Sequence, residues 1–73
     1  MVKPTLVTNS IRSQREEAGI TQADLAARIG VTRQTLIAIE QGRYSPTLEL
    51  AFQIARAFQV GIDDLFQYPT EGD

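Results

Sequence analysis

The stretch from Thr21 to Gly42, TQADLAARIGVTRQTLIAIEQG, decides the fold that we expect for this chain of 73 residues. It reads as two short helices joined by a tight turn at Gly30, because glycine readily adopts the left-handed conformation in which many helices end. Thr21 and Thr32 each stand where a hydroxyl can accept a hydrogen bond from a free backbone N–H at a helix start. Apolar residues at helical spacing predict the inner faces, which are Leu25, Ala26 and Ile29 in the first helix and Leu36 and Ile39 in the second.

The second of these helices presents a polar leading end. Its residues Arg33, Gln34 and Ile37 should point away from the core, with Ala38 at the margin. An arginine can pair with guanine, and a glutamine with adenine, through two parallel hydrogen bonds in the major groove of DNA. A helix with this exposed start therefore suits the reading of base edges.

Residues on both sides of this stretch predict further helices. A first helix is expected from about Thr8–Ser10 to Ala18. Thr47 should cap a fourth helix that ends near Phe58, and Ile62 should begin one or two turns of a fifth. No alternation of polar and apolar residues is long enough to predict a sheet. The sequence therefore predicts an all-α bundle of five short helices.

The length of the chain predicts a single domain, which we place at residues 8–67. Residues 1–7 are expected to form a flexible N-terminal segment, and residues 68–73 an acidic C-terminal tail. Two other interpretations of the N-terminal segment stay open. It can be a basic arm that reaches DNA through Lys3, or residues 5–7 can form a strand that pairs with a partner chain.

The composition excludes several classes of protein. The chain has no cysteine and no histidine, so no disulfide framework, thiolate metal site or histidine base is expected. Without a paired nucleophile and base, we expect neither an enzyme nor a cofactor, and no small-molecule ligand is evident. Asp63 and Asp64 suit the start of a helix better than a metal site. No apolar run approaches the ~20 residues of a membrane span, and we expect a cytoplasmic protein.

The net charge of −2 argues against nucleic acid only at first sight. Residues 60–73 contain four acidic residues and no basic one, so they account for −4. Residues 1–59 contain all seven basic residues and five acidic ones, which leaves the body at +2. The body is therefore weakly basic, and its non-specific affinity for DNA should be modest because it can neutralise few phosphates.

Three pieces of the sequence, in this order and spacing, resemble one known family. They are REEAGITQADLAARIGV, TRQTLIAIEQGRYSPTLELAFQIARAF and VGIDDLF, which together span most of the chain. The chain resembles the phage repressor and Cro family, the XRE-type helix-turn-helix regulators. The resemblance implies that helices two and three form the helix-turn-helix and that helix three lies in the major groove of DNA.

The resemblance also implies roles for individual residues. The implied base contacts are Arg33, Gln34, Ala38 and Ile37. The implied phosphate contacts are Gln22, Thr32, Thr35, Arg43 and Tyr44. Arg15 and Glu40 match positions that form an ion pair between helices one and three. Gln22 and Thr32 can alternatively serve only as surface and capping residues, and Tyr44 can pack under its loop.

One recognition helix covers too few base pairs to specify a site, so we expect a dimer on a palindromic operator with half-sites about 34 Å apart. Surplus apolar residues, together with the resemblance, suggest an interface formed by Phe52, Ile62, Phe66 and Tyr68. The expected function is that of a small transcriptional repressor that binds double-stranded DNA. The alternative is a helical protein-interaction module, such as an antitoxin-like subunit.

Two positions depart from the family pattern. Gln59 stands where glycine or asparagine often ends helix four, so this helix end is expected to be strained or built differently. Gly61 stands where a serine often caps helix five.

Overall fold

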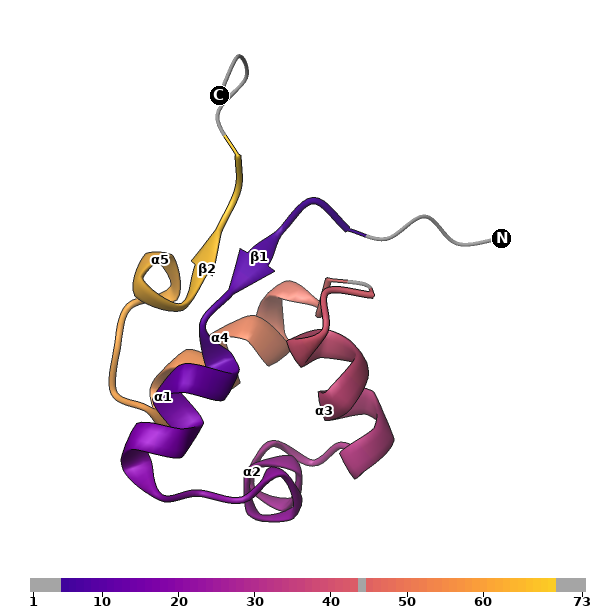
Figure 1. Cartoon of the computed structure of the whole chain (residues 1–73), viewed down its shortest axis with the longest axis vertical. Coiled ribbons are helices and arrows are strands. Elements are labelled where there is room, and N and C mark those ends of the chain that lie inside the picture. The colour runs from indigo at the N-terminus through magenta and orange to yellow at the C-terminus, as the bar shows by residue number, and fades with distance from the viewer. Residues whose placement is uncertain (1–4, 44, 70–73) are drawn as a thin grey trace.

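The computed structural model describes residues 5–43 and 45–69, and in these ranges the chain forms five helices and one pair of short strands (Figure 1). The elements in chain order are β1 (Thr8–Asn9), α1 (Ile11–Ala18), α2 (Gln22–Ile29), α3 (Arg33–Glu40), α4 (Leu48–Ala57), α5 (Ile62–Leu65) and β2 (Phe66–Gln67). The prediction of an all-α domain of five short helices is confirmed. Within the described ranges, no helix is long and apolar enough to cross a membrane.

The helix starts follow from local side-chain chemistry. The hydroxyl of Thr21 accepts a hydrogen bond from the backbone N–H of Asp24 at 3.1 Å. Thr32 caps α3, and Thr47 caps α4, with the same geometry and the same distance of 3.1 Å. Each bond satisfies one of the backbone donors that a helix start leaves free. The three predicted threonine caps are therefore confirmed.

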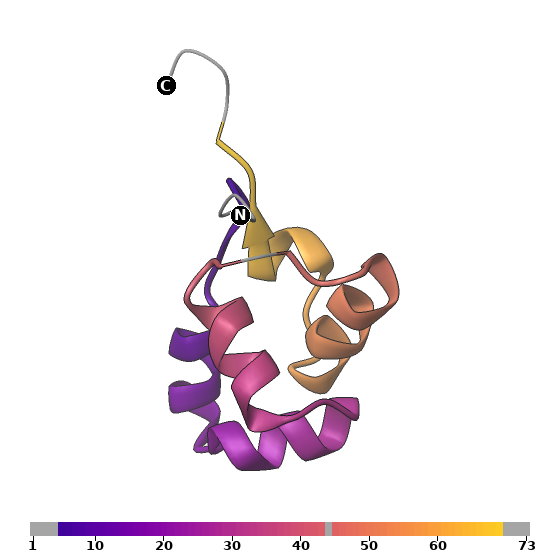
Figure 2. The ribbon, with the colours of Figure 1, turned by 90° about the vertical axis from the view of Figure 1, so that its right-hand side faces the viewer.

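The turn between α2 and α3 has the predicted backbone conformation. Gly30 has φ = +75°, and its N–H bonds back to the last turn of α2. This turn sets α2 across the start of α3, as the view onto α3 in Figure 2 shows. The helices enclose a core of buried apolar side chains, namely Ile11, Leu25, Ala26, Ile29, Leu36, Ile39, Ile54, Ala55 and Leu65. All five residues predicted for the inner faces of α2 and α3 are among them.

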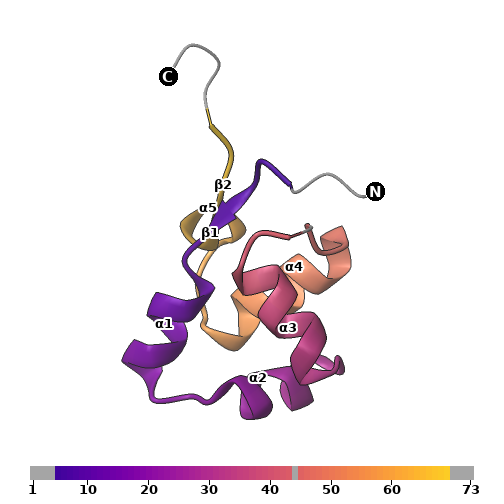
Figure 3. The same ribbon diagram turned by 45° about the vertical axis from the view of Figure 1, so that its right-hand side comes forward.

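The strand pair is a correction to the sequence analysis, which predicted no sheet. Thr8 of β1 pairs with Gln67 of β2, and Asn9 pairs with Phe66, in antiparallel register. Strands of two residues show no alternation, and their partners lie at opposite ends of the sequence, so no local pattern could predict the pairing. The strands lie side by side at the end of the domain opposite α2 (Figures 1 and 3). Helix α1 begins at Ile11 with Ser10 at its N-cap position, which agrees with the start expected near Thr8–Ser10, while Thr8 and Asn9 form β1.

The two departures from the family pattern have visible structural consequences. Gln59 has φ = +57°, a left-handed conformation that strains a residue with a side chain. Gly61 begins α5 without a side-chain cap. Instead, its backbone N–H donates to Oδ2 of Asp64 at 3.1 Å, so the acid stabilises the helix start from within the helix.

Candidate nucleic-acid interface

Helix α3 lies at the surface with its two faces divided as the sequence predicted. Leu36 and Ile39 are fully or almost fully buried in the core. Arg33 and Gln34 are exposed at the start of the helix, while Ile37 and Ala38 are half-buried beside the exposed face. The leading end of α3 therefore offers one guanidinium group and one amide to solvent.

A groove of about 660 Å³ lies between α1, α2 and α3. Gln22 of α2 and Arg33 of α3 both line this groove, which brings an expected phosphate contact and an expected base contact to one hollow. Arg12 and Glu16 of α1 line it as well and form an exposed ion pair at 3.3 Å. The groove is thus bordered by polar groups from three helices.

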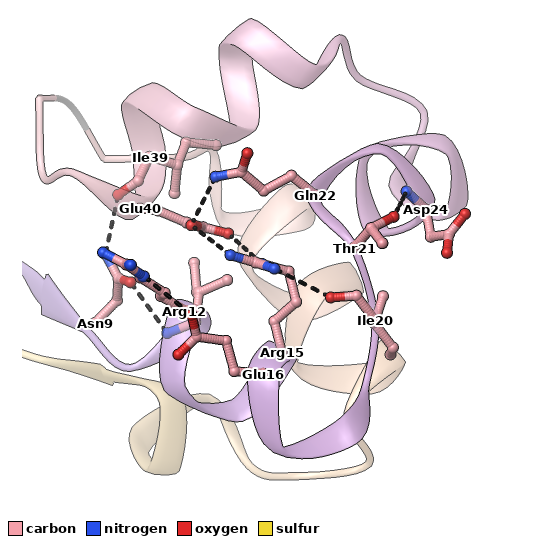
Figure 4. A network of polar contacts seen from close by, with 11 residues as sticks. Asn9, Arg12, Arg15, Glu16, Ile20, Thr21, Gln22, Asp24, Ile39 and Glu40 are labelled. Carbon is pink, nitrogen blue, oxygen red and sulfur yellow. Dashed lines mark hydrogen bonds and ion pairs between the residues drawn. The ribbon is translucent and has the colours of Figure 1, made fainter.

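A nearly buried ion pair holds α1 against α3 (Figure 4). Nε of Arg15 donates to Oε2 of Glu40 at 2.9 Å, and Nη2 donates to Oε1 at 3.4 Å. The two side chains are only 11% and 4% exposed. Nη1 of Arg15 also donates to the carbonyl oxygen of Ile20 at 3.1 Å, so the guanidinium group joins α1, the α1–α2 link and α3. The ion pair implied by the resemblance is present in the structure.

Gln22 joins the same network. Its Nε2 donates to Oε1 of Glu40 at 3.3 Å. Figure 4 marks this bond with a dashed line. An amide nitrogen carries two N–H groups, so this bond leaves the second for a ligand. Glu40 therefore orients the amide of Gln22 while it neutralises Arg15.

The expected phosphate contacts on α3 and after it differ in what their side chains do. Oγ1 of Thr32, which caps the helix, also donates to Oγ1 of Thr35 at 3.0 Å, so the two hydroxyls are bonded to each other. Arg43 is exposed directly after Gly42, which has φ = +73°. The expected contact at Tyr44 lies outside the described residues.

Asn9 makes a hydrogen bond to α3 that the sequence analysis did not predict. Its Nδ2 donates to the carbonyl oxygen of Ile39 at 2.9 Å, and its Oδ1 accepts from the N–H of Ile11 at 3.1 Å. One side chain, one residue before the N-cap Ser10, therefore satisfies the first backbone N–H of α1 and a carbonyl in the last turn of α3. The bond at the start of α1 is visible in the sequence as an asparagine just before a helix, but the bond to α3 has no local signal.

The residues expected at a dimer interface lie on α4, at the start of α5 and on the segment after α5. Phe52 is 53% exposed and Tyr68 is 66% exposed, while Ile62 and Phe66 are half-buried. Leu48, which the sequence analysis did not include, is 70% exposed.

Asp63 and Asp64 stand in the first turn of α5. In the described part of the chain, no group of three or more acidic side chains is placed to hold a metal ion.

Two short helices that meet at the tight turn of Gly30, the second with Arg33 and Gln34 exposed at its start, form a helix-turn-helix. The molecule is therefore a small DNA-binding domain of this class.

Comparison with known proteins gives the family. The chain belongs to the helix-turn-helix family HTH_3, the XRE-type regulators, whose profile matches residues 11–65. It is 56% identical over 63 residues to an HTH-type transcriptional regulator of Methanothermobacter thermautotrophicus, a match that covers 85% of this chain and 91% of the relative. The chain is accordingly a transcriptional regulator with a helix-turn-helix DNA-binding domain and not an enzyme.

Solved structures include the same fold within longer chains. The clp gene regulator ClgR from Corynebacterium glutamicum is 30% identical, with a TM-score of 0.70 over 74% of this chain and 57% of that one. HppE, solved with FeII and a substrate, is also 30% identical, with a TM-score of 0.72 over 86% of this chain and 36% of that one.

Proposed function

We propose that this regulator binds a palindromic operator in double-stranded DNA as a homodimer and represses transcription in the cytoplasm. The observation that carries the proposal is the exposed leading end of α3, where Arg33 lines the same groove as Gln22 and the next residue, Gln34, is exposed. A proposed base contact, Arg33, and a proposed phosphate contact, Gln22, thus border one groove.

In this proposal, Arg33 and Gln34 read base edges in the major groove by paired hydrogen bonds, arginine to guanine and glutamine to adenine. Ala38 and Ile37, which are half-buried beside them, offer apolar contact to thymine methyl groups. The proposed phosphate contacts are Gln22, Thr32, Thr35 and Arg43. Arg15 is a structural residue and not a DNA contact, because Glu40 and the carbonyl of Ile20 occupy its guanidinium group.

The dimer follows from the size of the reading surface. One α3 spans too few base pairs to specify an operator, so two copies related by a two-fold axis must read two half-sites. The proposed interface is formed by Phe52, Ile62, Phe66 and Tyr68. It is supported by the exposed fractions of Phe52 and Tyr68, which are 53% and 66%.

Selection of bound sequences from a random DNA pool tests base reading. We expect the intact protein to select a palindrome, and Arg33→Ala and Gln34→Ala each to lose preference at one position of each half-site. Arg43→Ala should instead weaken binding to all sequences about equally and flatten its salt dependence. Arg28→Ala is the matched control, because Arg28 is an exposed arginine of α2 that we do not place at the DNA. Equal selectivity of the Arg33, Gln34 and Arg28 variants would contradict the proposal.

A second candidate function is a protein-interaction module of the antitoxin-like kind. Its support is the exposed apolar side chains of Leu48 and Phe52, which offer a contact surface to a partner protein. A fold alone does not define a function, so the DNA selection decides between the two. Retention of the same DNA by all the variants would favour the interaction module.

A further inference from the structure

The outer face of α4 carries an arrangement of charges that is complementary to itself. Glu49 lies in the first turn of the helix and Arg56 in its last, and both side chains are exposed. A separation of seven residues is almost two full helical turns, so the two charges share one stripe about 10 Å apart. Phe52 lies between them along the helix, on the neighbouring stripe. Among the described residues, the ion pairs of the domain involve neither Glu49 nor Arg56.

We propose that α4 packs antiparallel against α4 of a second copy, with Glu49 of each copy paired with Arg56 of the other. A two-fold axis next to Phe52 places the acidic start of each α4 beside the basic end of the other, so the dimer has two equivalent ion pairs. The same face then serves both copies, which is the requirement of a two-fold dimer. This inference rests on the proposed dimer and assigns to it residues outside the expected interface.

A surface hollow supports the same register independently of the charges. The hollow, of about 560 Å³, is bordered by α4, by the link between α4 and α5 and by the start of α5, including Phe52, Ala55, Arg56, Gln59 and Ile62. In an antiparallel pair of helices, a step forward along one helix corresponds to a step backward along the other. If residue 49 of one copy faces residue 56 of its partner, residue 48 therefore faces residue 57. Leu48 of one copy then lies over the hollow of the other.

Leu48 is suited to that position. Its side chain is 70% exposed, at the first residue of α4, which is an unfavourable location for a large apolar group in a monomer. Insertion between residues of the facing helix would bury it as a knob in a hole. Because Ile62 borders the hollow, the α4 contact continues into the part of the interface already proposed at Ile62 and Phe66.

Charge exchange tests the register. Glu49→Arg and Arg56→Glu each replace two attractive contacts per dimer by two repulsive ones, and we expect each to weaken the dimer about tenfold or more. The double variant restores both contacts in exchanged positions and should recover most of the affinity. Leu48→Asp should also weaken the dimer, and no second charge change should rescue it. Sedimentation equilibrium over a range of protein concentrations measures the dissociation constants of the unaltered protein and of the four variants.

The controls are single charge reversals elsewhere on the exposed surface. Glu17→Arg of α1 and Arg28→Glu of α2 change the net charge by the same amounts and should leave the dimer unchanged. Circular dichroism confirms that each variant remains helical.

Recovery in the double variant supports the α4 register. If Phe66→Asp dissociates the dimer but the charge variants of α4 do not change its dissociation constant, this inference is overturned. The proposal that the protein is a dimer is then still supported. A chain that stays monomeric with and without operator DNA overturns both.

Discussion

Removal of the carboxylate in Glu40→Ala should be the most destabilising change among the polar residues of this domain. The substitution deletes the acceptor of two hydrogen bonds from Arg15 and one from Gln22. It also leaves the charge of Arg15 in a site where the side chain is only 11% exposed. Loss of one partner of a buried ion pair typically costs about 3 to 5 kcal/mol. Arg15 keeps its bond to the carbonyl of Ile20, so we expect the lower end of that range, about 3 kcal/mol.

Thermal and urea denaturation measure this cost. For a domain of this length, a loss of about 3 kcal/mol lowers the midpoint of thermal unfolding by roughly 15 °C. Glu16→Ala is the matched control, because Glu16 forms an ion pair with Arg12 in which the side chains are 75% and 58% exposed. An exposed pair of this kind contributes at most about 0.5 kcal/mol, so the midpoint should move by no more than a few degrees.

A double substitution separates the charge from the packing. In Arg15→Met combined with Glu40→Leu, neither charge remains unpaired, and apolar side chains fill the space between α1 and α3. We expect this variant to recover most of the stability that Glu40→Ala loses, since a buried ion pair is seldom worth more than a well-packed apolar pair. If Glu40→Ala is no less stable than Glu16→Ala, the argument from burial is wrong.

Two backbone positions and one side chain provide further predictions. Gly30→Ala should cost about 1 kcal/mol through the left-handed φ of +75° alone, since an added Cβ meets no atom within 4 Å. Gln59→Gly should instead stabilise the domain by about 0.5 kcal/mol, because it relieves the same strain at φ = +57°. Asn9→Asp keeps the acceptor for α1 but loses the donor to Ile39, and should cost about 1 kcal/mol. Urea denaturation of each variant measures all three, and a Gln59→Gly variant that is less stable would contradict the strain argument.

The parts of the fold that the sequence predicted depend on local chemistry. A threonine three residues before a free backbone N–H caps α2, and a glycine at Gly30 ends it, without help from distant residues. Helical spacing separates the buried Leu36 from the exposed Gln34, which is two residues away and faces the other side of the helix. Each of these features depends on residues within one or two helical turns of each other, so neighbouring residues in the sequence are sufficient to predict it.

The contacts that could not be predicted join segments far apart in the chain. The pairing of β1 with β2 and the bond from Asn9 to the carbonyl of Ile39 leave no periodic trace in the sequence. The ion pair of Arg15 with Glu40 was expected only from the family resemblance, because the helical pattern does not specify which charges meet. The bond from Gln22 to Glu40 was not expected, although it sets the orientation of a proposed phosphate contact.

The distribution of charge reconciles DNA binding with a net charge of −2. Asp63 and Asp64 belong to α5, which lies at the end of the domain opposite α2 in each view (Figures 1 to 3). The carboxylate of Glu40 lies close to the proposed DNA face, but Arg15 neutralises it at 2.9 Å. The positive charge of Arg33 at the leading end of α3 is thus not neutralised by these acids. A large basic surface would instead bind DNA of any sequence. Discrimination between operators must then come from base contacts and from the pairing of two copies.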